Sequence, residues 1–179
     1  MRSPLGPLAA LDQALLVRRA AAATAVTFLI QFATGWALRN PVAPYGIVSL
    51  ELAGSADRAE EIVASWEEAN ILGLATANVL LDYSFLVSYA VLLVALSVRA
   101  GMRVETPVSM TTGYTVGWGQ WLAGGLDAVE NVALLVLLAG AISDLTAGIA
   151  RAAAVGKFVL IGVGLLWVVT AEVVRLVRR

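Results

Sequence analysis

Long apolar runs separated by short polar segments set the pattern of this chain. Four of them are long enough to cross a membrane, over residues 20–38, 71–98, 108–140 and 149–174. A helix needs about 20 mostly apolar residues to cross the hydrocarbon core of a bilayer. The pattern therefore predicts an all-α membrane protein with four transmembrane helices, which form a single integral membrane domain over residues 1–179.

The segment that precedes the first apolar run predicts a short interfacial helix. Leucines recur at helical spacing within residues 1–17, and the basic pair Arg18 and Arg19 follows them. A short amphipathic segment of this kind lies along a membrane surface rather than across it.

The connection over residues 40–70 predicts a second amphipathic helix. Ser55 is a suitable N-cap for a helix over residues 56–68, in which Ile62 and Trp66 share one face and acidic residues occupy the rest. We expect this helix to lie on the outer surface of the bilayer, with Trp66 at the level of the lipid headgroups.

The two remaining connections, residues 99–107 and 141–148, predict short turns. The run between them, residues 108–140, carries several glycines and small residues at the spacing that lets helices pack closely. The same glycines are typical of kinked transmembrane helices, so the pattern leaves a continuous helix and a broken helix both open.

Basic residues are distributed unevenly between the two ends of the predicted spans. With the N-terminus in the cytoplasm, the inner side carries Arg2, Arg18, Arg19, Arg99, Arg103, Arg175, Arg178 and Arg179, and the outer side carries Arg39, Arg58, Arg151 and Lys157. The positive-inside rule then places both termini in the cytoplasm. Because arginine far outnumbers lysine, the composition indicates a GC-rich bacterial genome, and we expect a multi-pass protein of the bacterial plasma (inner) membrane.

The composition removes several kinds of chemistry. Hydrophobic residues make up 60% of the chain and charged residues 14%, and there is no cysteine and no histidine. Disulfides, thiolate nucleophiles, Fe–S clusters, histidine-ligated haem and cysteine- or histidine-ligated zinc are therefore excluded within this chain. Any metal would be bound by oxygen ligands, which favours Mg²⁺, Ca²⁺ or Mn²⁺. The scattered basic residues give no indication of nucleic-acid binding.

Ionisable residues inside the apolar runs are the main functional signal. Asp127, Glu130 and Asn131 follow one another at i, i+3 and i+4, so they share one face of a helix. A charged side chain at the centre of a membrane helix costs about 2.5–3.5 kcal/mol, so a partner, a bound cation or water must offset it.

Further polar residues are predicted to lie at the same depth. Asn78 and Asp82 belong to the second run, and Lys157 lies about two turns into the fourth. Counted from the outer ends of their helices at about 1.5 Å per residue, Asp82, Glu130 and Lys157 fall in one outer-to-middle layer. Glu51, in an apolar part of the outer connection, is placed to close this layer from above.

Two interpretations of these residues compete. In the first, Lys157 neutralises one carboxylate and the remaining groups satisfy each other in a structural ion-pair network. In the second, the polar residues form a functional site. Three acids, Asp82, Asp127 and Glu130, outnumber the one lysine, and such a surplus of buried acids is typical of proton relays and cation sites. We favour the second interpretation because the first does not account for the surplus of acids.

The leading hypothesis is an outward-opening carboxylate pocket that binds a cation or a cationic or polar lipid-like ligand, with proton-coupled transport as one use. One alternative is a membrane-embedded enzyme that modifies lipids, in which Asp82, Asp127 and Glu130 act with or without a divalent metal. The other is a non-catalytic accessory subunit. Whether the chain is an enzyme is left open. The expected partners are the bilayer, a small cationic or lipid ligand, and a second copy or larger membrane complex.

Overall fold

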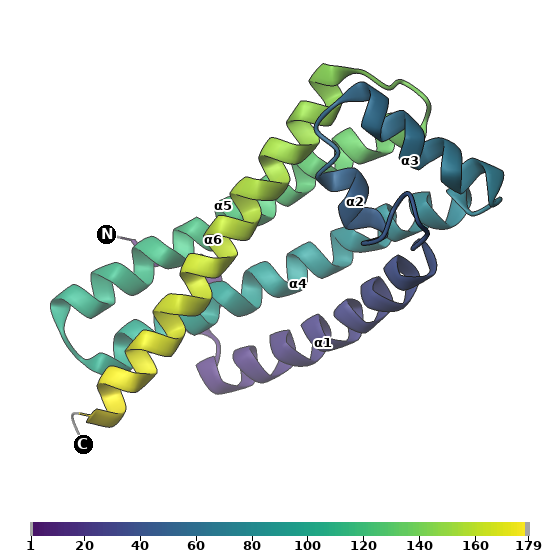
Figure 1. The fold of residues 1–179 in the computed structure, drawn as a ribbon. Helices are drawn as coiled ribbons and strands as arrows, with labels where there is room; N and C mark the ends of the chain where they lie inside the picture. Colours follow the sequence, from purple (N-terminus) through teal and green to yellow (C-terminus); the bar gives the residue numbers. More distant parts are fainter. Residues whose placement is uncertain (1, 178–179) are drawn as a thin grey trace. The chain divides into compact units, whose positions relative to one another are not determined.

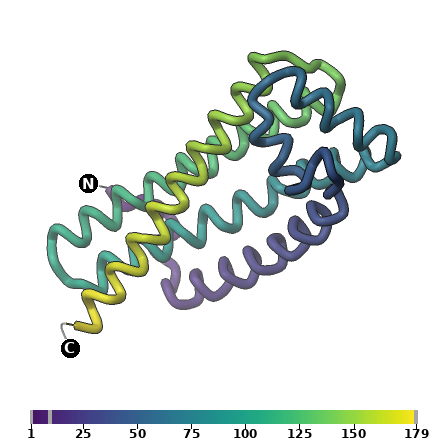
Figure 2. Tube along the Cα trace, viewed as in Figure 1, coloured from purple at the N-terminus to yellow at the C-terminus, as the bar shows by residue number. Residues whose placement is uncertain are grey.

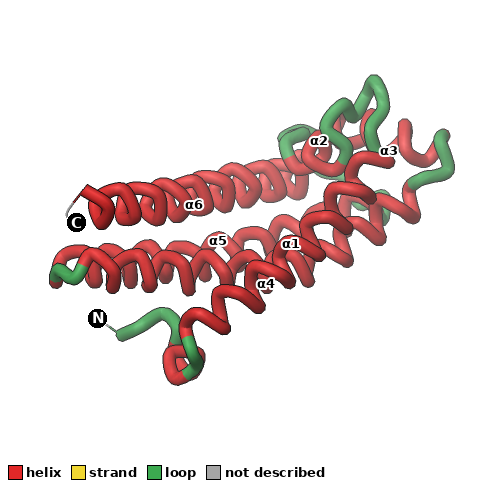
Figure 3. The backbone as a smooth tube through the Cα atoms, turned by 90° about the horizontal axis from the view of Figure 1, so that it is seen from below, coloured by secondary structure: helices red, strands yellow, loops and turns green. Residues whose placement is uncertain are grey.

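The computed structural model describes residues 2–177, so Arg178 and Arg179 of the predicted basic tail lie outside the described residues. Within this part the chain consists of helices joined by turns and loops, with no strand (Figure 3). The elements are the 3₁₀ turn η1 (Gly6–Ala10) and the helices α1 (Gln13–Ala37), α2 (Ile47–Glu51), α3 (Ala56–Glu68), α4 (Leu72–Val104), α5 (Pro107–Leu138) and α6 (Asp144–Val177) (Figure 1).

Four of these helices, α1, α4, α5 and α6, are long and apolar enough to cross a membrane. The prediction of four candidate spans in an all-α protein is therefore confirmed. The spans are longer than predicted at several ends, because charged residues that were assigned to turns continue the helices.

The start of α1 differs from the prediction. Only the short turn η1 precedes it, and Leu15 and the Arg18–Arg19 pair belong to α1 itself. The N–H groups of Leu15 and Ala14 donate to Asp12 Oδ1, at 3.1 and 2.7 Å, and lower the pKa of that carboxyl below its usual value. This cap stabilises α1 above the ordinary pKa of aspartate, and the contribution is lost as the pH falls through the lowered value.

The turn predicted over residues 99–107 is wrong in its extent. Helix α4 continues to Val104, and the reversal occurs at Glu105, which has a φ of 59°. Helix α5 then begins at Pro107, a residue well suited to the first turn of a helix, and Thr106 Oγ1 accepts the N–H of Ser109. The arginines of this segment therefore extend a helix, because a basic residue by itself does not end one.

The turn predicted over residues 141–148 is also shorter than expected. Helix α6 begins at Asp144, where Ser143 Oγ accepts the N–H of Thr146 at 3.2 Å. Helix α5 is one continuous α-helix, so the broken-helix alternative is wrong. Its glycines serve close packing instead: a Cβ added at Gly113 would lie 2.7 Å from the carbonyl oxygen of Ser97.

The chain divides into two compact units. Each long helix, which can be followed by residue number in Figure 2, contributes residues to both units. Unit 1 comprises residues 1–24, 87–124 and 157–179, and unit 2 comprises residues 25–86 and 125–156. With the exception of Lys157, every predicted site residue belongs to unit 2.

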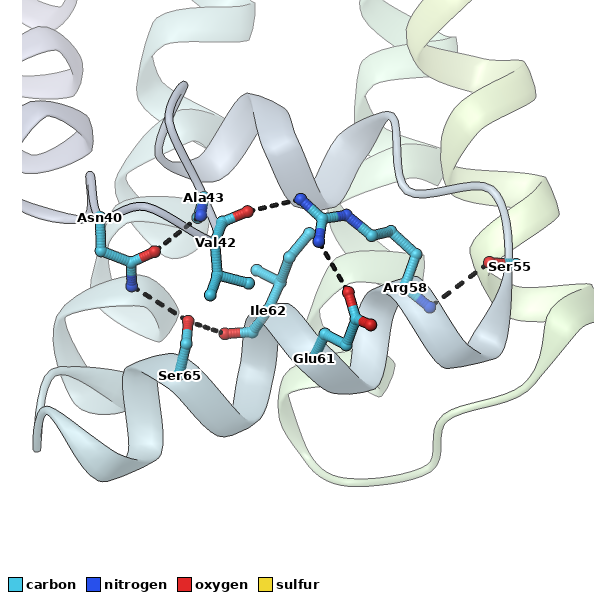
Figure 4. Close-up of polar contacts among 8 residues, drawn as sticks. All are labelled: Asn40, Val42, Ala43, Ser55, Arg58, Glu61, Ile62 and Ser65. Atoms are coloured by element: carbon cyan, nitrogen blue, oxygen red, sulfur yellow. Dashed lines mark hydrogen bonds and ion pairs between the residues drawn. The ribbon is translucent and has the colours of Figure 1, made fainter.

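Helices α2 and α3 form one end of unit 2. The predicted bounds of α3 and its Ser55 cap are confirmed, with Ser55 Oγ accepting the N–H of Arg58. Asn40 donates to Ser65 Oγ at 3.0 Å, and the guanidinium of Arg58 donates to the carbonyl of Val42 (Figure 4). These contacts fix the connection that follows α1 against α3.

The apolar face of α3 is buried within unit 2. Trp66 is fully buried, and its indole N–H donates to the carbonyl oxygen of Leu38 at 2.8 Å. The ring of Trp66 therefore packs in the protein interior rather than against lipid, and its placement at the level of the headgroups stays a prediction. Asp144 Oδ1 accepts the N–H of Ala56, so the connection between α1 and α4 and the start of α6 lie at the same end of unit 2.

In unit 1, a close contact between Gly164 and the buried side chain of Gln120 gives a prediction about stability. A Cβ at Gly164 would lie 2.5 Å from Gln120 Nε2, which donates to the carbonyl of Leu160 at 2.9 Å. We expect Gly164→Ala to destabilise the protein by about 1–3 kcal/mol in thermal unfolding in detergent. Gly162→Ala, on the same helix with no atom within 4 Å of the added Cβ, is the control and should be neutral or stabilising. Equal stability of the two variants would contradict this packing.

Candidate functional site

The carboxylate of Asp82 is held by two side-chain amides in unit 2. Gln31 Nε2, from α1, donates to Asp82 Oδ1 at 2.9 Å, and Asn131 Nδ2, from α5, donates to Oδ2 at 2.8 Å. Three helices therefore meet at one carboxylate. The bond joins Asp82 to Asn131, two of the predicted site residues.

The direction of the hydrogen bonds on the α1 side is fixed by the backbone. The hydroxyl of Thr34 donates to the carbonyl of Ile30 at 2.8 Å, so its oxygen is an acceptor for Asn78 Nδ2, at 2.6 Å. Asn78 Nδ2 also donates to Gln31 Oε1, and Gln31 Nε2 donates to the carbonyl of Asn78. Only one orientation of each amide satisfies these bonds, and it directs the N–H of Gln31 at Asp82.

Gln31 and Thr34 belong to the site but were not predicted as site residues. They are two of the few polar residues in the first apolar run, which was the available signal. A single polar residue in a transmembrane helix usually makes an interhelical hydrogen bond, and a sequence alone does not say to which group.

The two acids of α5 are more deeply buried than Asp82. Asp127 is 2% exposed and Glu130 is 0% exposed, whereas Asp82 is half-buried. Asn131 directly follows Glu130, one turn after Asp127, and supplies the amide that donates to Asp82. Along their own helices, Asp127 lies eleven residues before Leu138 and Asp82 lies ten residues after Leu72, which is about 15 Å in each case.

Glu51 and Lys157 are also buried. Glu51 is the last residue of α2 and is 7% exposed, so the expectation that it turns inward from the connection is consistent with its position in unit 2. Lys157 is 6% exposed and belongs to unit 1, with its Nζ 5.1 Å from the ring centroid of Phe158. Because α6 begins at Asp144, Lys157 lies thirteen residues after the start of its helix rather than about two turns into it.

Metal binding gains no support from this geometry. Within residues 2–177, no group of three or more acidic side chains is arranged to hold a metal ion. A site formed by Asp82, Asp127 and Glu130 with Mg²⁺, Ca²⁺ or Mn²⁺ remains a prediction from the sequence.

No family model matches the chain, and neither curated proteins nor solved structures give a match. On its own residues, the chain is an apolar, helical protein with four candidate membrane spans and a set of buried carboxylates.

Proposed function

We propose that this chain is a multi-pass membrane protein whose buried carboxylates bind a cationic ligand and exchange it with protons, a binding or transport function rather than a catalytic one. A single observation carries the proposal: Glu51, Asp127 and Glu130 of unit 2 are each less than 10% exposed. Lys157 is the only buried lysine or arginine among residues 2–177.

This ratio of charges favours an exchangeable cation. Each buried carboxylate must lose its charge to a proton or face a positive charge, because an ionised group in the apolar interior is costly. Three such acids outnumber the one buried lysine, so we expect protons or a cationic ligand to contribute to their neutralisation. A group of acids that alternates between these two states is the elementary requirement for proton-coupled exchange.

The proposal includes a location. The excess of arginine on one side of the predicted spans supports an orientation with both termini in the cytoplasm of a bacterial cell. In that orientation, α2 and α3 lie outside.

Ligand-dependent thermal stability tests the proposal. The detergent-purified protein is heated over a range of pH with methylammonium, Mg²⁺, Ca²⁺ or Mn²⁺, beside Asp127→Asn. A ligand present at 100 times its Kd, and bound to the folded state alone, stabilises by about 2.7 kcal/mol. We expect methylammonium to stabilise the parent protein increasingly at higher pH, where protons no longer compete, and to leave Asp127→Asn unchanged.

The matched control is Asp57→Asn, an exposed acid on the outer face of α3. It removes the same charge from the surface, so it should retain the methylammonium response. If no ligand stabilises the parent protein and Asp127→Asn is merely less stable, the acids form a structural network and the proposal is wrong. If only a divalent cation stabilises the protein, the ligand of the carboxylates is a metal ion and not an organic cation.

A further inference from the structure

We propose that the ligand is an amphiphilic ammonium compound that enters from the bilayer beside α1, with its ammonium group on Asp82 and its apolar chain on Phe28, Phe32 and Phe85. This inference rests on the proposed function and names the chemical class of its ligand. It depends on contacts within unit 2 alone.

Asp82 differs from the acids of α5 in its exposure. It is half-buried, whereas Asp127 and Glu130 are at most 2% exposed. Its two oxygens accept N–H groups from neutral amides, those of Gln31 and Asn131. An ammonium group offers the same N–H donors with a full positive charge, and such charge-assisted bonds are about twice as strong as neutral ones.

Aromatic residues lie one helical turn from this carboxylate and from the amide that donates to it. Phe85 is one turn after Asp82 on α4, and its ring centroid is 6.0 Å from that of Phe28, which is one turn before Gln31 on α1. The ring of Phe32 lies 6.2 Å from that of Phe28. A carboxylate beside aromatic faces is the combination that recognises an ammonium group attached to an apolar body.

The same rings face outward. Phe28 and Phe32 are each 51% exposed. In the most apolar stretch of α1, only 6% of the residues are buried, whereas the corresponding share is 39% in α4 and 50% in α5. A bilayer therefore contacts the aromatic rings directly, and a ligand dissolved in that bilayer can reach Asp82 without crossing a water-filled entrance. A small hydrated cation has no apolar chain to dissolve in the bilayer or to bind the rings, so this route does not favour it.

The test compares amines of different chain length on the protein in lipid nanodiscs. Binding of ethylammonium and decylammonium is measured by equilibrium dialysis, with decanol and decyl phosphate as uncharged and anionic probes. Free concentrations are corrected for partition into nanodiscs without protein. After this correction, we expect decylammonium to bind about tenfold more tightly than ethylammonium, and decanol and decyl phosphate to bind weakly.

Three variants identify the contacts. Asp82→Asn should abolish the preference for decylammonium over decanol. Phe28→Ala should reduce the corrected affinity for decylammonium and leave ethylammonium unchanged. Leu29→Ala removes a side chain that is also exposed on α1, at 63%, and should leave both amines unchanged.

The outcomes separate this inference from the proposed function. If the two amines bind equally after correction, or if Phe28→Ala and Leu29→Ala behave alike, lateral binding of an amphiphile is wrong. Ethylammonium binding that still requires Asp127 would then leave the proposed function intact. If neither amine binds the parent protein, both the inference and the proposed function fail.

Discussion

Gly46→Ala is expected to lower the free energy of unfolding by about 3 kcal/mol or more. Gly46 has φ 60° and ψ −132°, a backbone conformation that side chains strongly disfavour. A Cβ at this position would lie 2.2 Å from the carbonyl oxygen of Gly35. This oxygen belongs to the backbone of α1, so it cannot move away by a change of side-chain rotamer. The substitution therefore combines backbone strain with a steric clash.

Chemical or thermal unfolding in detergent, followed by circular dichroism, measures this effect. Gly73→Ala is the matched control, because no atom lies within 4 Å of its added Cβ and the residue is in the first turn of α4. It should be neutral or slightly stabilising. A Gly46→Ala variant as stable as Gly73→Ala would mean that the connection after α1 does not pack on Gly35.

Trp66→Ala is expected to destabilise the protein by about 3–5 kcal/mol. The Trp66 side chain is fully buried, and its removal leaves a large cavity between α3 and the rest of unit 2, together with an unsatisfied carbonyl at Leu38. Trp66→Phe should fall between the parent and Trp66→Ala, since it keeps most of the ring volume and loses the hydrogen bond.

The control for Trp66 is Trp36→Ala, which truncates a ring that is 58% exposed on α1. It should change stability by about 0.5 kcal/mol or less. If the two alanine variants were equally stable, Trp66 would lie at the membrane surface, as its position in an amphipathic helix first indicated.

Both substitutions fall in the segment between the first two spans, which is a packed part of unit 2 and not a flexible link. Sequence analysis predicted the bounds of α3 correctly because Ser55 is a strong capping residue and Ile62, Val63 and Trp66 recur at helical spacing. It did not predict what the apolar face contacts, since a bilayer surface and a protein interior both accept the same side chains.

The helix ends near residues 99–107 and 141–148 were predicted less well. Charged and polar residues suggested turns there, but helices continue through such residues as long as the backbone stays in the helical conformation. The actual reversals depend on single residues with positive φ, Glu105 and Gly140, and on the proline that starts α5. A glutamate in that conformation leaves no signal in the sequence.

For the candidate site, spacing alone correctly indicated which acids share a face of α5, because the helix fixes that geometry. The roles of Gln31 and Thr34 could not be predicted, since they depend on which face of α1 meets α4. That choice is made by a few hydrogen bonds and by the contact of Phe28 with Phe85, in a helix on which most of the large apolar side chains are exposed.

The one-way chain of hydrogen bonds from Thr34 through Asn78 and Gln31 to Asp82 also has a consequence for proton movement. A proton hops along a chain only if each member can accept a proton on one side and release another on its opposite side. A neutral side-chain amide keeps its own N–H protons, and here each amide has its orientation fixed. The polar residues on the side facing α1 therefore do not conduct protons. Any proton that reaches or leaves Asp82 must travel by another route.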